Sequence, residues 1–453
     1  EIFNRLFLVL QLSTFTFALL YPNSIFFFIC FKTLIVICFI RLLFDCYHKR
    51  NKIYPLDFLI LLPGIWGVTL GFLLDNPGLD YEIPLYLFAP ISYLLVLRFS
   101  RKDFFEWIMP VIKIACAVHL TIFFYLFFGS GGEVWNFFQS ETFFTTQLVE
   151  GHHKVFSLQA NQLLFFLPVI FIHSYFKINI VNAILVIGSV LMALLIARKS
   201  IVLLYAAYFI FLLGYSLYEK RNLNYILRVF APVLISCLLF TLINPNNLTK
   251  LTSSIAQSFS FEQSFSFEQS FSSEQSFSSE QSFSWDYLYS SETNRCNLDN
   301  IFASDEYKDE GYYKTVAKVR FIQAKILIEE ISLSPWFGKG VGYVAKQCIR
   351  SAILPWRHEM SYFGVMLNLG IIGLLIYIFI YVKWTLDALR TKLEKSVMVP
   401  ILGGSLFFVI SSVTNPYILS VERLLILFIP YLLISVSRYT GSIGVLTSKA
   451  KSN

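Results

Sequence analysis

The sequence has few charged residues. Aspartate, glutamate, lysine and arginine make up 14% of its 453 residues, whereas soluble globular proteins have about 25%. This low content excludes an ordinary soluble domain as the class of most of the chain. The formal net charge of +7 does not indicate a nucleic-acid partner, because most of the lysines and arginines lie in short breaks between apolar runs.

Metal-binding patterns are also missing. The seven cysteines and six histidines form no CxxC pair and no other spacing typical of a metal site, so we expect no metal and no other cofactor. Five cysteines lie in apolar runs and are expected to be inert: Cys30, Cys38, Cys46, Cys116 and Cys237. Cys296 and Cys348 share the largest polar loop and could pair if it faces an oxidising compartment; the sequence leaves this open.

Hydrophobic residues, by contrast, make up 56% of the chain. They recur in runs of roughly 20, the length needed to cross a bilayer as a helix. We therefore expect an all-α integral membrane protein with about 12 transmembrane helices. The expected spans are 6–20, 25–47, 55–74, 84–98, 104–128, 161–176, 180–196, 200–217, 225–245, 359–382, 397–413 and 420–437.

The distribution of lysine and arginine predicts the orientation of these spans. Cytoplasmic loops of membrane proteins are enriched in both residues, and five basic clusters fall on one side of the expected spans. They lie at 49–52, 98–102, 220–221, 383–395 and 438–451. We expect that side, with both chain termini, to be cytoplasmic.

Three regions follow along the chain. An N-terminal transmembrane region covers 1–245, with about nine helices and an external loop at 129–160. A large external loop covers 246–358, and a C-terminal region at 359–453 has about three helices and a cytoplasmic tail.

The large loop has two dissimilar parts. Five hexads such as QSFSFE and QSFSSE run from Gln257 to Asp286; they favour a disordered or surface-lying insert, with a β-forming, self-associating segment as the alternative. In the second part, 312–358, apolar residues from 316 to 331 recur at helical spacing. We expect an amphipathic helix there, lying on the membrane.

The second part also holds the main candidates for function. Arg320 lies on the expected helix, a Pro-Trp-Phe-Gly-Lys-Gly-Val-Gly run occupies 335–342, and His358 directly precedes an apolar span. Glycines at 338, 340 and 342 would allow a turn whose N–H groups bind an anion. Arg320 could instead be solvated on its helix, and His358 could simply cap the next helix.

Arg198 and Lys199 break the charge pattern. They lie in a turn that the topology places on the external side, where basic residues are scarce. Either the pair extends to the membrane interface from a tight hairpin, or it binds an anionic group there. Arg423, near the outer end of the last span, is either a partner of its neighbour Glu422 or part of an acceptor site.

Taken together, these segments resemble the bacterial O-antigen ligase and O-antigen polymerase family. The resemblance rests on Ala-Arg-Lys-Ser at 197–200, on the Arg320 helix that leads into PWFGKGVG, on His358 followed by Tyr362 and LNLGIIGLL, and on Asn161 at the start of a span. The chain departs from the family pattern at Glu359, where asparagine is common, and in its hexad array.

The resemblance implies a GT-C-like membrane glycosyltransferase that needs no metal. Its substrate would be a glycan on undecaprenyl diphosphate, transferred at the periplasmic face of the bacterial inner membrane. His358 would be the catalytic base, and Arg198 with Arg320 would bind the diphosphate. The expected substrate-binding residues are Lys199, Gly338, Gly340, Gly342, Asn161, Tyr362 and Arg423.

Two functions fit this resemblance, and a third comes from a different class. A polysaccharide polymerase, with a chain-length regulator protein as a partner, would join lipid-linked repeat units. A ligase would transfer the glycan to lipid A-core. A transporter of lipid-linked oligosaccharide, from a different class, would need the spans but no catalytic histidine.

Overall fold

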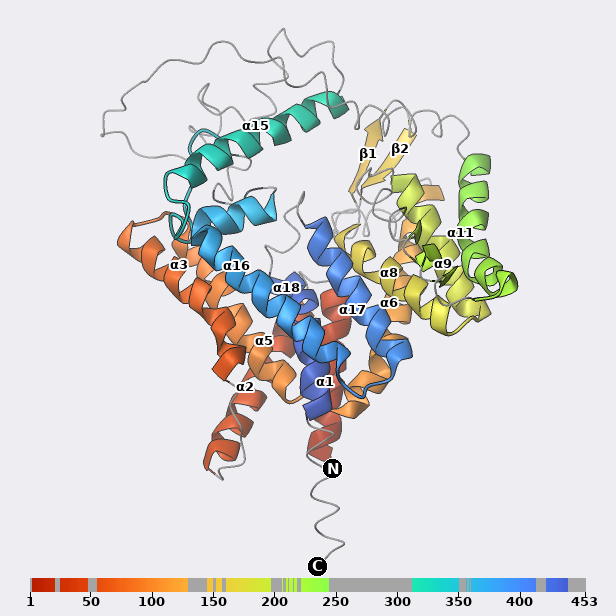
Figure 1. Ribbon diagram of the computed structural model, residues 1–453, viewed down its shortest axis with the longest axis horizontal. Helices are drawn as coiled ribbons and strands as arrows, with labels where there is room; N and C mark the ends of the chain where they lie inside the picture. The colour runs from red at the N-terminus through yellow and green to blue at the C-terminus, as the bar shows by residue number, and fades with distance from the viewer. Residues whose placement is uncertain are drawn as a thin grey trace, which may run out of the picture. The chain divides into compact units, whose positions relative to one another are not determined.

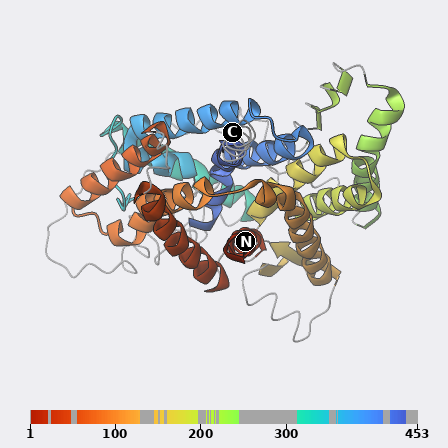
Figure 2. The same cartoon turned by 90° about the horizontal axis from the view of Figure 1, so that it is seen from below.

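The computed structural model describes residues 2–20, 25–47, 55–128, 145–149, 152–156, 160–196, 221–243, 312–349, 360–412 and 421–438, together with positions 206, 209, 210, 212–214, 216, 217, 356 and 358. The described residues are mostly helical, as Figures 1 and 2 show. They belong to two compact units. The first unit comprises 1–119, 164–173 and 285–453, and the second comprises 120–163 and 174–284.

The first unit holds most of the helices. They are α1 (Ile2–Leu20), α2 (Ile25–Tyr47), the 3₁₀ helix η1 (Pro55–Ile60), α3 (Leu61–Leu73), α4 (Leu79–Ile83), the π-helical turn η2 (Pro84–Phe88), α5 (Ala89–Arg98), α15 (Tyr312–Ser332), α16 (Ser361–Leu389), α17 (Lys395–Ser411) and α18 (Val421–Leu427). Parts of α6 (Lys102–Phe128) and α8 (Ala160–Phe176) also belong to it.

The helices have the length and composition of membrane spans. Within the described residues, five are long and apolar enough to cross a bilayer, and they lie at Ile25–Phe44, Leu79–Arg98, Lys102–Phe128, Leu223–Ile243 and Ser361–Leu389. Shorter apolar helices lie near five further expected spans. The chain is therefore a mostly helical membrane protein. The count of twelve spans stays a prediction, since the expected span at 200–217 falls largely outside the described residues.

The second unit contains a β-hairpin that we did not predict. Strands β1 (Thr145–Val149) and β2 (His152–Phe156) pair antiparallel, with Gln147 opposite Lys154. They lie in the segment expected as an external loop. In the same unit α9 (Ile180–Ile196) packs against α11 (Leu223–Ile243), side by side in Figures 1 and 2.

In the first unit, α3 packs closely on its neighbours through a row of glycines. Gly64, Gly67 and Gly71 recur every three or four residues and are buried on one face. A Cβ atom at Gly64 would lie 2.1 Å from the Tyr86 carbonyl oxygen, and one at Gly71 would lie 2.5 Å from the Val341 carbonyl oxygen. Small residues at such spacing let backbones approach within a membrane, and here they bring η2 and the segment 335–342 against α3.

Helix α16 is interrupted at Gly370. This residue has φ 71° and ψ 178° inside an otherwise helical segment, and Figure 1 shows the ribbon changing direction after its first turns. A positive φ favours glycine because it lacks a Cβ atom. The break divides α16 into a short first part, which packs under α15, and a long second part.

Helix α15 lies where the sequence predicted an amphipathic helix. Ile326, Leu327 and Ile331 are buried, whereas Phe321 and Ile328 are exposed. Leu327 and Ile331 share one core cluster with Ala345 and with Leu367 of α16. The hexad array lies outside the described residues, so its interpretation stays a prediction.

Candidate functional site

The turn that follows α15 depends on its three glycines. Gly338, Gly340 and Gly342 all have positive φ, at 74°, 83° and 80°. Each also faces backbone at very short range: a Cβ atom would lie 2.5 Å from the Gly370 nitrogen, 2.4 Å from the Gly71 nitrogen and 2.3 Å from the Leu79 nitrogen, respectively. The turn therefore fits tightly between α16 and the α3–α4 segment.

This turn also completes the hydrogen bonding of the interrupted helix. The N–H of Lys339 donates to the Leu367 carbonyl at 2.7 Å, and the N–H of Gly340 donates to the Asn368 carbonyl at 3.1 Å. In the other direction, the N–H of Ile371 donates to the Pro335 carbonyl at 2.8 Å. Backbone groups left over at a helix break must find partners within a membrane protein, and segment 335–340 supplies them.

The anion-binding turn expected from the glycines differs from this arrangement. The N–H groups of residues 338 to 341 all donate to backbone carbonyls of the first unit, so they are not available to an anion. The positive φ of Gly338, Gly340 and Gly342 thus has a structural explanation in the packing of the turn. Their expected substrate-binding role stays a prediction.

The same turn is held from the α3–α4 side by Asn76. Its side-chain amide donates to the Lys339 carbonyl at 2.9 Å and to the Val341 carbonyl at 3.1 Å. The Trp66 indole N–H donates to the Phe337 carbonyl at 3.2 Å. These bonds join segments about 270 residues apart in sequence, as their separations of 263 to 271 show.

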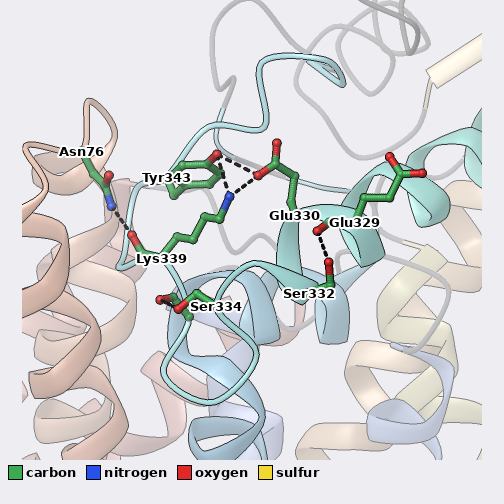
Figure 3. Close-up of polar contacts among 8 residues, drawn as sticks. Asn76, Glu329, Glu330, Ser332, Ser334, Lys339 and Tyr343 are labelled. Carbon is green, nitrogen blue, oxygen red and sulfur yellow. Dashed lines mark hydrogen bonds and ion pairs between the residues drawn. The ribbon is translucent and has the colours of Figure 1, made fainter. Parts of the chain in front are cut away.

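Lys339 extends from this rigid turn into a polar cluster with the end of α15 (Figure 3). Its ammonium group pairs with the Glu330 carboxylate and donates to the Tyr343 hydroxyl at 3.2 Å. The Tyr343 hydroxyl donates to the same carboxylate at 2.9 Å. Each of the three side chains thus contacts the other two, so Glu330 is held in one position.

The titration behaviour of the cluster favours its charged form. Burial lowers the pKa of Lys339, but the hydrogen bonds that its ammonium group donates to Glu330 and Tyr343 outweigh that effect, so the pKa is above its usual value. Burial, followed by the Glu330 charge, raises the pKa of the Tyr343 hydroxyl. At neutral pH the lysine is therefore protonated and the tyrosine neutral.

His358 lies buried near this cluster. Its side chain is 2% exposed, and neither ring nitrogen has a hydrogen-bond partner among the described residues. Burial lowers the pKa of His358 to about 4, while the nearby Glu330 charge opposes the shift. The imidazole is consequently neutral at pH 7, with one nitrogen able to accept a proton and the other able to donate one.

The remaining expected site residues are placed less completely. Tyr362 lies at the start of α16, where its hydroxyl donates to the Val409 carbonyl of α17 at 2.8 Å. The backbones of Arg320, Asn161 and Arg423 lie in α15, α8 and α18, but their side chains are outside the described part. Arg198 and Lys199 lie outside it altogether. Thus His358, the 338–342 turn and α15 are brought together, and no contact with the arginines is described.

The site contains residues that we did not single out in the sequence. Glu330, Lys339 and Tyr343 form the cluster, and Asn368 donates to the Tyr86 hydroxyl at 3.1 Å within the buried helix break. The sequence offered two signals: a lysine flanked by two glycines, and a pair of adjacent glutamates at a helix end. Neither signal shows that the lysine pairs with a glutamate, because that pairing depends on the geometry of the turn.

Trp356 fixes the segment before His358. Its indole N–H donates to Glu82 at 3.0 Å, and its ring stacks on Tyr81 with centroids 5.1 Å apart. Gly78 lies directly against this indole. Because Trp356 is two residues from His358, the histidine backbone is anchored to α4.

Cys348 is disulfide-bonded, and the other half of that bond lies outside the described side chains. Cys30, Cys38, Cys116 and Cys237 form no disulfide. Within the described part of the chain, no three histidine, cysteine, aspartate or glutamate side chains lie close enough together to hold a metal ion.

Comparisons with known proteins identified no relative of this chain. No protein-family model matches the sequence, and searches of curated proteins and of solved structures gave no significant match.

Proposed function

We propose that the chain is a membrane glycosyltransferase that polymerises undecaprenyl diphosphate-linked oligosaccharides at the periplasmic face of the bacterial inner membrane. The observation that carries the proposal is His358, a buried, neutral histidine next to the first part of a membrane helix, whose ring nitrogens have no hydrogen-bond partner among the described residues. Ionisable residues at such places are functional candidates by default.

In the proposed reaction, a sugar hydroxyl of the acceptor attacks the anomeric carbon of the donor. A new C–O bond forms while the bond to the diphosphate oxygen breaks, and the diphosphate leaves with that electron pair. The hydroxyl proton passes to a ring nitrogen of His358, which is neutral and so able to accept it. Arg198 and Arg320 would balance the charge on the leaving diphosphate.

The disulfide at Cys348 supports the proposed orientation. Disulfides persist in oxidising compartments such as the bacterial periplasm, and Cys348 belongs to the same ordered segment as Lys339 and Tyr343. The ordered segment would therefore face the periplasm, where lipid-linked glycans are joined.

A His358→Ala variant tests the proposal. We expect surface glycans of cells carrying this variant to collapse to single repeat units, while the protein stays in the membrane at wild-type level. His173→Gln is a suitable control, since His173 is a buried histidine of the first unit whose Nδ1 contacts the Ser396 carbonyl. Wild-type chain lengths in His358→Ala cells would contradict a catalytic role.

Electrophoresis of the same glycans separates the alternatives. In a deletion strain, single repeat units on lipid A-core indicate a lost polymerase. Long polymer retained on its lipid carrier indicates a lost ligase. Lipid-linked units trapped on the cytoplasmic side indicate a lost transporter.

A further inference from the structure

The buried face of α15 contains a polar residue, Gln323, whose amide has no hydrogen-bond partner in the described part of the chain. The Gln323 side chain is 0% exposed, and both its amide oxygen and its amide nitrogen lack a hydrogen-bond partner among the described residues. Its neighbours on that face, Ile326 and Leu327, are apolar and buried. Burying an amide without partners costs free energy, so packing alone does not explain a glutamine there.

The position of Gln323 relates it to the proposed site. Residues 320, 323, 327 and 330 are spaced by three, four and three positions, which places them on one face of a helix. Arg320 is therefore one turn before Gln323, and Glu330 is two turns after it, about 10 Å along the axis. Glu330 is the residue whose charge acts on His358.

The chemistry of the carboxamide narrows the class of ligand. It offers two donors and an acceptor and has no charge. A phosphate would satisfy only the NH₂ group of the amide, and a cation would satisfy only its oxygen. A sugar hydroxyl both donates and accepts, so it fits the amide of Gln323 and also the neutral ring of His358.

We propose that Gln323 binds a hydroxyl of the glycan and orients the sugar relative to His358. The inference rests on the proposed function, because Gln323 would give that site its specificity for the glycan. It also accounts for four buried polar atoms, two on Gln323 and two on His358, that have no hydrogen-bond partner within the described residues and that a bound sugar would satisfy.

The test uses the full-length protein in lipid nanodiscs and the undecaprenyl diphosphate-linked glycan extracted from membranes of the source strain. Gln323→Met keeps the side-chain length and removes both polar groups. We expect its thermal midpoint to equal or exceed that of the wild type, since two unpartnered polar atoms are gone. We expect KM for the glycan to rise about ten- to hundredfold, as loss of one or two hydrogen bonds predicts.

Two further variants make the result specific. Gln323→Asn retains the amide on a shorter side chain and should recover part of the lost affinity. Leu327→Met, one turn further on the same buried face, should change neither KM nor the midpoint by much. Undecaprenyl diphosphate without sugar should bind wild type and Gln323→Met equally, because the proposed contact is to the glycan.

The outcomes separate this inference from the proposed function. Weaker glycan binding by Gln323→Met, together with no glycan transfer by the wild-type protein, would keep the sugar site and overturn the proposed glycosyltransferase. A raised midpoint with unchanged glycan binding in Gln323→Met would make Gln323 a core residue only and overturn the inference. Equal weakening of glycan and sugar-free carrier would also overturn it.

Discussion

A single neutral histidine dominates the chemistry at the scale of residues. Burial keeps His358 uncharged at pH 7, whereas a histidine in an unfolded chain has a pKa of about 6.5. Below that pH the unfolded state takes up a proton that the folded state does not take up until about pH 4. Acid therefore favours unfolding at this residue.

This difference predicts a pH dependence of stability. Between pH 7 and pH 4, wild-type protein in detergent should lose more thermal stability than His358→Gln, since glutamine takes up no proton. Above pH 7 the thermal midpoints of the two proteins should change with pH by the same amount. Parallel melting curves across the range would mean that His358 is protonated equally in both states.

The cluster on Glu330 gives a second prediction at this scale. Glu330→Gln leaves the Lys339 ammonium group without its carboxylate, while both side chains are mostly buried, at 18% and 15% exposure. We expect a loss of about 1–3 kcal/mol in the free energy of unfolding, between the values for exposed and buried pairs. Chemical unfolding monitored by tryptophan fluorescence measures it.

The controls are the single variant Lys339→Met and its combination with Glu330→Gln. If the pair interacts as the structure describes, the double variant Glu330→Gln/Lys339→Met should lose less than the two single losses added together. Additive losses would show that the two side chains do not stabilise each other.

At the scale of elements, the turn at 335–342 and the break in α16 form one unit. Gly340 has φ 83° and faces the Gly71 nitrogen. Gly340→Ala should therefore destabilise the protein by about 2–4 kcal/mol, combining the cost of a positive φ with steric overlap. Gly214→Ala is the matched control, because a Cβ atom there meets nothing within 4 Å; thermal unfolding compares the two. Similar midpoints would contradict the close approach.

These elements show how far sequence reasoning reaches. Apolar run lengths predicted the membrane helices, and the spacing of Ile326, Leu327 and Ile331 predicted α15, because both signals are local. The glycines of PWFGKGVG predicted positive φ equally well. What they contact depends on α3 and α16, which lie far away in sequence, so the expected anion site could not be checked from the motif.

The candidate site shows the same limit. His358 was recognisable because an imidazole beside an apolar span is unusual. Glu330 and Gln323 were not, since glutamate and glutamine on an amphipathic helix ordinarily face water. Their burial follows from how α15 packs on α16, and a single sequence does not specify that packing. The β-hairpin at 145–156 was missed because its strands are only five residues long.

At the scale of the whole molecule, one ion pair joins two segments that are far apart in the sequence. Arg438 lies 2.9 Å from Asp57 of η1, across a separation of 381 residues. The Asp57 side chain is only 8% exposed. Removing a partner from such a pair leaves a buried charge uncompensated, which is costly.

Asp57→Ala should therefore reduce the free energy of unfolding by about 2–4 kcal/mol. Asp103→Ala is the control, because Asp103 pairs with Arg101 at 3.6 Å while 53% exposed, and exposed pairs contribute about 0–1 kcal/mol. Limited proteolysis of membranes gives a second measurement, since the Asp57 variant should release its C-terminal helix sooner. Equal losses of stability in Asp57→Ala and Asp103→Ala would show that the Asp57–Arg438 pair is exposed to solvent.

The interrupted α16 has a consequence for biogenesis. Its leftover backbone groups are completed by Pro335, Lys339 and Gly340, which precede it in the chain. During synthesis that segment emerges from the ribosome before α16 does. The turn that completes the hydrogen bonding is therefore already available when the broken helix enters the bilayer. A circular permutation that made α16 emerge first would force it into lipid with those groups unsatisfied. The order of the segments in the chain thus ensures that the backbone groups at the break in α16 find their hydrogen-bond partners.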